Sequence, residues 1–208
     1  CKKALLAGEE MVRDMAEAGY RLIAVGEMGI GNTTTASAVA CALTGAEVSR
    51  MTGRGAGLSD EGLARKVAAI ERALAVNHPD RDDPVGVLAK VGGFDIAAMA
   101  GAFLGGAKYG VAVLVDGFIA SVAALCAQRM MPEARDFMLA SHVSREPAGA
   151  FLLEQLGLTP ILAAGMALGE GTGAVAVMPL IDMALAVYRG ATFGDIAVEA
   201  YVPQEGGT

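Results

Sequence analysis

Short apolar runs alternate with longer stretches in which apolar residues recur every three or four positions. The runs at 22–25 and 111–115 are the clearest, and a glycine or an aspartate follows each of them. Such runs are typical of strands that are buried on both faces of a parallel sheet. Weaker runs near 137–140 and 160–163 predict two further strands.

The longer stretches have the spacing of helices that bury one face. In the first of them Leu5, Met11 and Met15 share that face, and Ser59 is placed to cap a later helix whose first turn carries Asp60. Helices are predicted at about 2–18, 34–43, 85–90, 96–104, 119–130 and 147–156, besides the helix after Ser59 and one that begins after Gly173.

Alternating strands and helices require crossover connections, which are right-handed in parallel sheets. The pattern therefore predicts an α/β fold: a doubly wound, mostly parallel sheet of the Rossmann-like class with helices on both faces. We expect an N-terminal helix at 1–20 that leads into the core, an α/β core at 21–190, and a C-terminal segment and tail at 191–208.

Composition and charge narrow the classes of ligand. Hydrophobic residues make up 54% of the 208-residue chain and aromatic residues only 5%, so the core is expected to consist of Ala, Val, Leu, Ile and Met. The net charge of −7 argues against a duplex nucleic-acid partner, which needs a basic face. A small phosphorylated ligand stays compatible, because backbone amides and one or two cations suffice to bind it.

The cysteines and histidines are too scattered for a metal site or a disulfide framework. Cys1, Cys41 and Cys126 lack CxxC spacing, which predicts a reduced, cytoplasmic chain. His78 and His142 are isolated in the sequence, so no metal is expected.

The most apolar stretch, 174–188, contains Pro179 and Asp182 and is too short to cross a bilayer. It predicts a buried helix, and no membrane partner is expected. The sequence shows no signal peptide and begins with Cys1 rather than Met. We therefore expect the chain to be part of a longer polypeptide.

Three glycine-rich turns carry polar groups at predicted strand ends, where open parallel sheets bind ligands. The first reads Gly26-Glu27-Met28-Gly29-Ile30-Gly31-Asn32-Thr33-Thr34-Thr35. It could present the amides of a helix start to an anion, although it matches neither GxGxxG nor the P-loop pattern. Glycines that only permit tight packing are the alternative. An acid, Glu27, beside such an anion loop favours a functional role.

The second turn, 168–173, holds Glu170 between two glycines, where it has no packing role. A solvated glutamate near a helix start explains it equally well. The third turn, 53–57, contains Arg54, and Lys66 follows on the next helix. Both could supply charge to a phosphate, although a single helix-surface lysine is usually just solvated.

Four further residues are weaker candidates. Asp116 follows a strand, but it could simply bond turn amides, and a local turn explains Ser141 nearly as well as substrate contact does. Asp95 is interpreted as a helix N-cap rather than a catalytic group. Met28 could line a pocket for a flat heterocycle, although core packing is the commoner role of methionine.

Four motifs resemble one enzyme family and occur in its order almost from end to end of the chain. They are Gly26 to Thr34, Lys90-Val91-Gly92-Gly93-Phe94-Asp95, Asp116-Gly117-Phe118 and Met166 to Ala174. The sequence thereby resembles the nicotinate-nucleotide–dimethylbenzimidazole phosphoribosyltransferases, transferases of cobalamin biosynthesis.

The resemblance implies transfer of phosphoribose from nicotinate mononucleotide to 5,6-dimethylbenzimidazole, which gives α-ribazole 5′-phosphate and nicotinate. It implies a homodimer, a nucleotide-binding core, and no metal or organic cofactor. Glu170 matches the family's proposed general base and Glu27 its second essential glutamate. Gly53 and Lys66 fall where the family contacts the nucleotide phosphate, and Ser141 is a further candidate there.

Combining both lines of reasoning, we expect an acceptor pocket that includes Met28 and Leu168. The residues expected to bind the substrate or its phosphate are Gly29, Gly31, Asn32, Thr33, Gly53, Arg54, Lys66, Asp116, Ser141, Gly169 and Gly171.

One departure from the family pattern is large, because members normally carry a substantial segment before the position of Cys1. That segment supplies a sheet strand, helices and part of the benzimidazole pocket. Two alternatives therefore stay open: a nucleotide-binding core that is inactive or weakly active alone, and a relative with another acceptor base.

Overall fold

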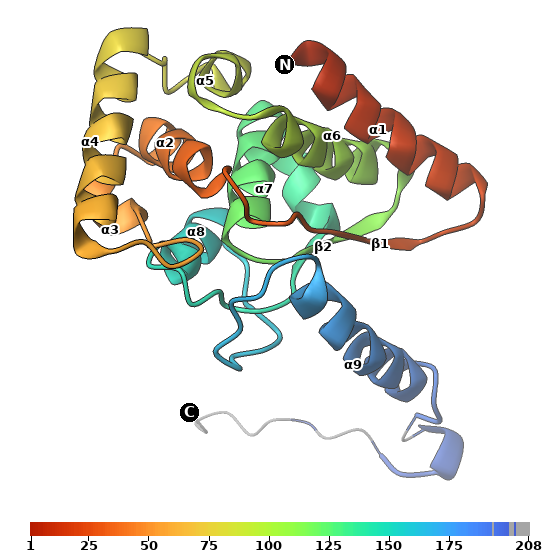
Figure 1. Cartoon of the computed structure of the whole chain (residues 1–208). Helices are drawn as coiled ribbons and strands as arrows, with labels where there is room; N and C mark the ends of the chain where they lie inside the picture. The colour runs from red at the N-terminus through yellow and green to blue at the C-terminus, as the bar shows by residue number, and fades with distance from the viewer. Residues whose placement is uncertain (193, 200–201, 203–208) are drawn as a thin grey trace. The chain divides into compact units, whose positions relative to one another are not determined.

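The computed structural model describes residues 1–192, 194–199 and 202. The chain divides into two compact units, Cys1–Val177 and Met178–Thr208 (Figure 1). Of the C-terminal segment expected at 191–208, residues 193, 200–201 and 203–208 lie outside the described residues.

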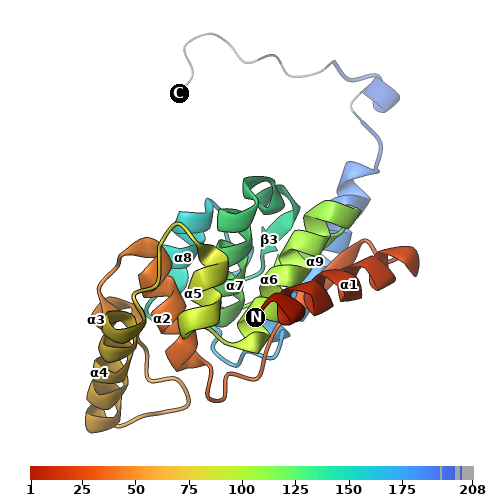
Figure 2. The ribbon, with the colours of Figure 1, turned by 90° about the horizontal axis from the view of Figure 1, so that it is seen from above.

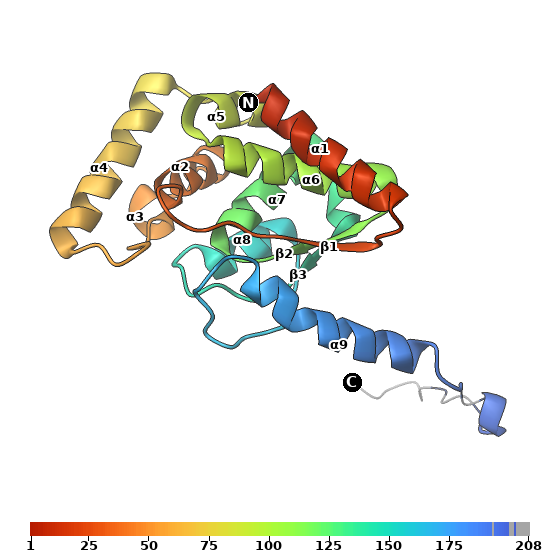
Figure 3. The same cartoon turned by 45° about the vertical axis from the view of Figure 1, so that its right-hand side comes forward.

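A three-stranded parallel sheet forms the centre of the first unit. Strand β1 (Leu22–Val25) pairs with β2 (Ala112–Val115), which pairs with β3 (Met138–Ala140). The three strands lie side by side in Figure 3. The predicted α/β fold with a parallel sheet is thereby confirmed.

The prediction of a fourth strand near 160–163 is wrong. The segment 160–163 contributes a single parallel bridge, between Leu162 and His142, beyond the end of β3. Ile161 N–H donates to the Ala140 carbonyl at 3.0 Å. Pro160 has no N–H to extend the ladder.

Helices occupy most of the remaining chain. Ser59 accepts a hydrogen bond from Gly62 N–H at 3.2 Å and so caps α4, as predicted. The described helices are α1 (Lys2–Glu17), α2 (Thr33–Thr44), α3 (Val48–Met51), α4 (Asp60–Asn77), α5 (Pro84–Val91), α6 (Phe94–Tyr109), α7 (Phe118–Met130), α8 (Gly149–Leu156) and α9 (Thr172–Tyr188), with short 3₁₀ helices η1 (Pro132–Phe137) and η2 (Gly194–Ile196).

The first helix packs directly on α6, as Figures 1 and 2 agree. A Cβ on Gly8 would lie 2.8 Å from the carbonyl carbon of Ala98, and one on Gly101 would lie 2.7 Å from that of Leu5. Only glycine at both positions lets the two backbones come this close. The contact fixes α6, whose first turn faces the site described below.

The main core lies on one face of the sheet. Val113 and Val115 of β2 are fully buried in the principal cluster of apolar side chains, together with residues of α2, α6 and α7. Leu114, which points to the opposite face by the alternation of a strand, is also fully buried but lies outside that cluster. Leu139 of β3 is partly exposed.

The helix expected to be buried at 174–188 is largely exposed. Within α9 only Gly173, Ala174 and Val177 are buried, all at its start. Val187 and Tyr188 are exposed, with 87% of Tyr188 accessible to solvent. The apolar run predicted burial, but most side chains of this helix are exposed. No described helix is both long enough and apolar enough to span a membrane.

Because the strands are parallel, their carboxyl ends meet at one edge of the sheet. The loop 26–32 follows β1 and leads to α2 (Figure 1). Asp116 follows β2, and Ser141 and His142 follow β3. The fold therefore brings the polar groups of these three connections together, as expected for an open parallel sheet.

Candidate active site

Two glycine-rich turns interlock at the end of β1. The N–H of Glu170 donates to the Glu27 carbonyl at 2.8 Å. A Cβ at Gly26 would lie 2.6 Å from the Cα of Gly171, which is closer than side chains can approach. Glycine at 26 is therefore required for the contact, and the contact places the two candidate glutamates on adjacent loops.

The buried carboxylate of Asp116 binds backbone amides of the second glycine-rich turn, 168–173, and of the helix start that follows it. One oxygen accepts a hydrogen bond from Gly171 N–H at 3.1 Å, and the other accepts one from Ala174 N–H at 3.1 Å. Asp116 is 2% exposed. These amides belong to the start of α9, where a negative charge is favourable. Both oxygens of Asp116 thus bond turn amides, one of the two interpretations of this residue.

Ser141 and His142 are packed next to the same turn. The Ser141 hydroxyl donates to the Val115 carbonyl at 2.7 Å and lies 3.0 Å from Nδ1 of His142. Ser141 is fully buried, so its hydroxyl serves the fold. A Cβ on Gly173 would lie 2.9 Å from Cγ of His142. The imidazole therefore requires glycine at 173.

The carboxylate of Glu27 is anchored within its own loop. Its Oε2 accepts hydrogen bonds from Gly29 N–H and from Nδ2 of Asn32, the latter at 2.6 Å. The Gly29 amide and the Asn32 side chain, both expected to bind substrate, are engaged by Glu27. Gly31 has a positive φ of 79° and turns the loop toward α2.

Glu170 occupies a left-handed conformation, with a φ of 58°, in a turn where its neighbours Gly169 and Gly171 also have positive φ. The left-handed region favours glycine, so a glutamate here costs conformational energy. Its side chain is exposed, and no hydrogen bond to it occurs among the described residues. A strained and unengaged carboxylate is typical of a functional position.

A cleft opens between these loops. Of the predicted site residues, those that line it are Glu27, Met28, Gly29, Thr33, Leu168 and Gly169. Met28 and Leu168, which both line the cleft, are 66% and 71% exposed. Met28 follows Glu27 in the sequence, and Leu168 belongs to the turn of Glu170, whose own side chain is not among the residues that line the cleft. Such exposed apolar side chains are suited to contact a flat apolar ligand.

Lys66 does not itself line the cleft but contacts Thr33, which does, and this part of the cleft is called the Lys66 end below. The Lys66 ammonium donates to the Thr33 hydroxyl at 2.9 Å and to the Gly53 carbonyl at 2.9 Å. Burial lowers the pKa of Lys66, and the nearby Glu146 carboxylate partly offsets this effect. A buried ammonium with two protein partners has a third N–H to donate. It lies beside the first turn of α2, whose amides have no partner within the helix.

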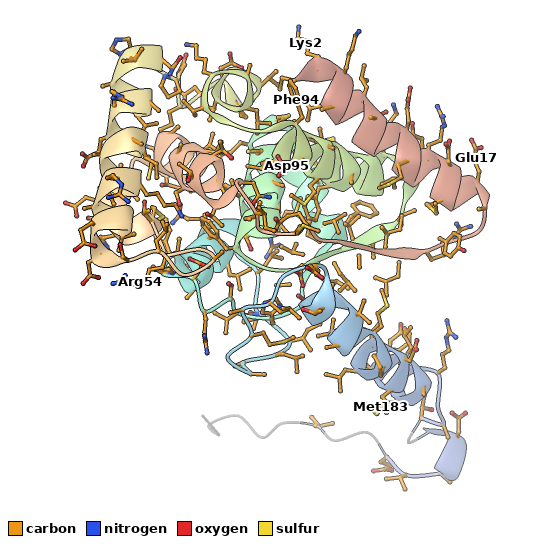
Figure 4. The ribbon with its side chains drawn as sticks, in the orientation of Figure 1. Lys2, Glu17, Arg54, Phe94, Asp95 and Met183 are labelled. Carbon is orange, nitrogen blue, oxygen red and sulfur yellow. The ribbon has the colours of Figure 1, made fainter. Side chains whose placement is uncertain are left out.

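Arg54 does not reach the region of Lys66 and Thr33. Its guanidinium pairs with Asp60 and donates to the Leu58 carbonyl at 2.8 Å, both close by in sequence. Figure 4 shows Arg54 at the outer side of the loop that leads to α4. Of the two cations considered from sequence, Lys66 is the one that reaches the region of Thr33.

Glu146, which was not predicted from the sequence, also lines the cleft. A Cβ on Gly53 would lie 3.0 Å from the carboxylate carbon of Glu146 and 2.9 Å from Cδ of Pro147. Gly53 is thus needed to make room for the segment after β3. The signal was present as a glutamate four residues after His142, but nothing in the spacing linked it to Lys66.

Comparisons with known proteins agree on one family. A family model described as Phosphoribosyltransferase matches residues 1–198. The chain is 47% identical over 203 residues to a nicotinate-nucleotide–dimethylbenzimidazole phosphoribosyltransferase of Acetivibrio thermocellus, which covers 97% of this chain and 58% of the relative. It is 50% identical over 196 residues to the protein of that name from Desulforudis audaxviator, which covers 94% of this chain and 56% of that protein.

A solved structure shows the same fold. The crystal structure of CobT from Thermus thermophilus superposes with a TM-score of 0.89 at 46% identity, over 95% of this chain and 59% of that one. The chain therefore spans a little under three fifths of the length of these relatives.

The two hydrogen bonds from Gly171 N–H and Ala174 N–H to Asp116, called the Asp116 clamp, lead to a testable prediction. Asp116→Asn replaces one acceptor oxygen by an NH₂ group, which leaves a buried N–H opposite a donor. We expect a loss of unfolding free energy of about 1–3 kcal/mol in denaturant titrations, together with faster hydrogen exchange at the amides of Gly171 and Ala174. Asp136→Asn, at an exposed position, is the control and should change stability by less than about 0.5 kcal/mol. Unchanged exchange at both amides would refute the clamp.

Proposed function

The chain belongs to the nicotinate-nucleotide–dimethylbenzimidazole phosphoribosyltransferase family, and from this premise we propose that the full-length protein transfers phosphoribose from nicotinate mononucleotide to 5,6-dimethylbenzimidazole. The products are α-ribazole 5′-phosphate and nicotinate, for cobalamin biosynthesis. The observation that carries the proposal is the main-chain hydrogen bond between Glu170 and Glu27. It joins two carboxylate-bearing loops at one cleft.

The nucleotide phosphate is proposed to bind at the Lys66 end. Three features support this: the first-turn amides of α2, the Thr33 hydroxyl and the remaining N–H of Lys66 converge there. A helix N-terminus with an adjacent cation is a ready anion site. Gly53 contributes its carbonyl to hold Lys66 rather than an N–H to the phosphate.

The reaction breaks the bond between the anomeric carbon and the pyridinium nitrogen and forms one to a benzimidazole nitrogen. Positive charge builds on the anomeric carbon and ring oxygen, and the carboxylate of Glu27 stabilises it. Glu170 accepts the N–H proton that the benzimidazole loses. Attack on the face opposite to the leaving nicotinate converts the β configuration to α.

The acceptor is proposed to lie against Met28 and Leu168, the exposed apolar side chains that line the cleft together with Glu27. The activity is proposed for the full-length protein, since the relatives extend well beyond the region matched by this chain. A core that binds the nucleotide without transferring it is the rival interpretation. Binding by the full-length protein without turnover would favour that interpretation.

The same family assignment supports a cytoplasmic homodimer that needs no metal or organic cofactor. All three cysteines are free, and burial raises the pKa of the Cys41 thiol to about 11 and that of Cys126 to about 12, so both stay protonated at neutral pH. Free buried thiols suit a reducing compartment. In the second unit, the exposed side chains of Met183, Val187 and Tyr188 offer apolar surface for a subunit contact.

The two glutamates provide the direct test of the proposed function. In the full-length protein, Glu170→Gln should lower turnover at least about 100-fold, because the amide cannot accept the proton. Glu27→Gln should also be damaging, and the double variant should lose less than the product of the single losses if the two residues act as a unit. Product formation is followed by chromatography.

Glu154→Gln, which changes an exposed glutamate of α8, is the matched control and should keep wild-type turnover. Undiminished turnover of Glu170→Gln would remove this residue from the mechanism.

Lys66 provides a separate test of the phosphate site. Lys66→Ala should weaken nicotinate mononucleotide by about 1–3 kcal/mol, the range for a hydrogen bond to a charged group, and should affect nicotinate riboside much less. A bound phosphate favours the charged lysine, so wild-type affinity should fall as pH rises through the lowered pKa of Lys66. The variant should lack that pH dependence.

Calorimetry with both ligands measures these effects. Lys90→Ala is the control, because this lysine also donates to a carbonyl, that of His78, but is exposed. Equal weakening of the nucleotide and the riboside would contradict a phosphate contact by Lys66.

A further inference from the structure

The sequence Gly92-Gly93-Phe94-Asp95, at the start of α6, has no part in the chemistry proposed above. Asp95 was expected to cap this helix. The cap residue is instead Gly93, and among the described residues no side chain caps the helix start. The Asp95 carboxylate therefore has a different role.

That role is a contact with the loop after β1. Nδ2 of Asn32 donates one hydrogen bond to Oδ2 of Asp95 at 2.7 Å and another to Oε2 of Glu27 at 2.6 Å. A single side-chain amide thus bridges two carboxylates that come from sequence positions far apart. In Figure 4, Asp95 lies on α6 next to this loop.

The bridge fixes the orientation of the amide. Ionised carboxylates only accept hydrogen bonds, so Asn32 must turn its NH₂ group toward Glu27 and Asp95 and its oxygen away. The oxygen, Oδ1, is buried and has no hydrogen-bond partner among the described residues. An unpaired buried oxygen is unfavourable, and two charge-assisted bonds on the other side of the amide offset it.

Gly93 makes the contact sterically feasible. A Cβ at position 93 would overlap Oδ1 of Asp95, because the carboxylate folds back over this residue toward Asn32. A Cβ at Gly92 would lie 2.6 Å from the Leu88 carbonyl oxygen. The glycine pair thus lets α6 begin directly after α5 with Asp95 folded back.

The bridge also decides which oxygen of Glu27 is available. Oε2 is engaged by Asn32 and by Gly29 N–H, whereas Oε1 lies on the side of Gly169, another residue that lines the cleft. Fixing one oxygen of a carboxylate fixes the position of the other.

We propose that Asp95 is a positioning residue for Glu27, which acts through Asn32 and holds the free oxygen Oε1 toward the reacting anomeric carbon. The inference deepens the proposed transfer reaction and rests on it. Asp95 itself does not touch the substrate. Its loss should therefore slow the chemical step without weakening the nucleotide, whose phosphate binds at the Lys66 end.

Steady-state kinetics of the full-length protein test this role. Asp95→Ala should lower kcat roughly tenfold to hundredfold, the range for losing one hydrogen bond to a charged group, and should change KM for nicotinate mononucleotide by less than about twofold. Asp95→Asn should recover most of the activity, because its amide oxygen can accept the same bond. In an Asn32→Ala background, Asp95→Ala should have no further effect, because the two act in series.

Glu61→Ala is the matched control, since it removes another exposed carboxylate from the first turn of a helix, α4. It should leave kcat unchanged. Wild-type kcat in Asp95→Ala, or losses from Asp95→Ala and Asn32→Ala that multiply, would overturn the inference.

A measurement without turnover separates this inference from the proposed function. In wild-type protein, NMR should find the two side-chain amide protons of Asn32 well separated and slow to exchange with solvent. Asp95→Ala should speed their exchange, whereas Glu61→Ala should not. Fast exchange in the wild type, or no change in Asp95→Ala, would overturn the inference even if transfer is observed. Slow exchange that Asp95→Ala abolishes supports it even if the wild type proves unable to transfer.

Discussion

The buried carboxylate of Asp116 is the interaction on which the rest of the site depends. A carboxylate removed from water is costly unless it is hydrogen-bonded, and here the amides of Gly171 and Ala174 satisfy both oxygens. Because Asp116 follows the central strand β2, it ties the start of α9 to the middle of the sheet. The turn that carries Glu170 then meets the end of β1, and the absence of a side chain at Gly26 lets the two loops touch.

This arrangement separates two tasks along one cleft. Glu27 and the exposed Met28 and Leu168 line one part of the cleft, and Thr33, which accepts a hydrogen bond from Lys66, lines another. The loop between β1 and α2 connects them, since it begins with Glu27 and ends at the helix start. A substrate with a phosphate at one side and a reacting sugar carbon at the other fits this polarity.

The sequence predicted the strands and loops that form the site, but not which residues are hydrogen-bonded to one another within it. Apolar runs located β1 and β2, and glycine turns located the loops, because these signals are local. The partners of Asp116 and Asp95 depend on contacts across more than fifty residues. Local sequence therefore left Asp116 between substrate binding and turn amides, and it favoured a cap role for Asp95. Arg54 and Lys66 looked alike in sequence, and only the packing of α4 on α2 buries Lys66.

The exposed part of α9 shows a second limit of prediction from the sequence. An apolar run indicates that a surface is to be covered, but it does not identify the covering partner. Glu170 illustrates a third case, in which a residue unfavourable in its left-handed backbone is retained at a turn. Conformational preference alone would place glycine there, so a glutamate between two glycines is a local signal of chemistry that the sequence itself carries.

The most direct test of the two-ended site is a crystal structure of the full-length protein with nicotinate mononucleotide. We predict that the phosphate lies within hydrogen-bond distance of the Lys66 ammonium and the first-turn amides of α2, with the anomeric carbon facing Glu27. A phosphate bound elsewhere, or an anomeric carbon turned away from both Glu27 and Glu170, would contradict the account.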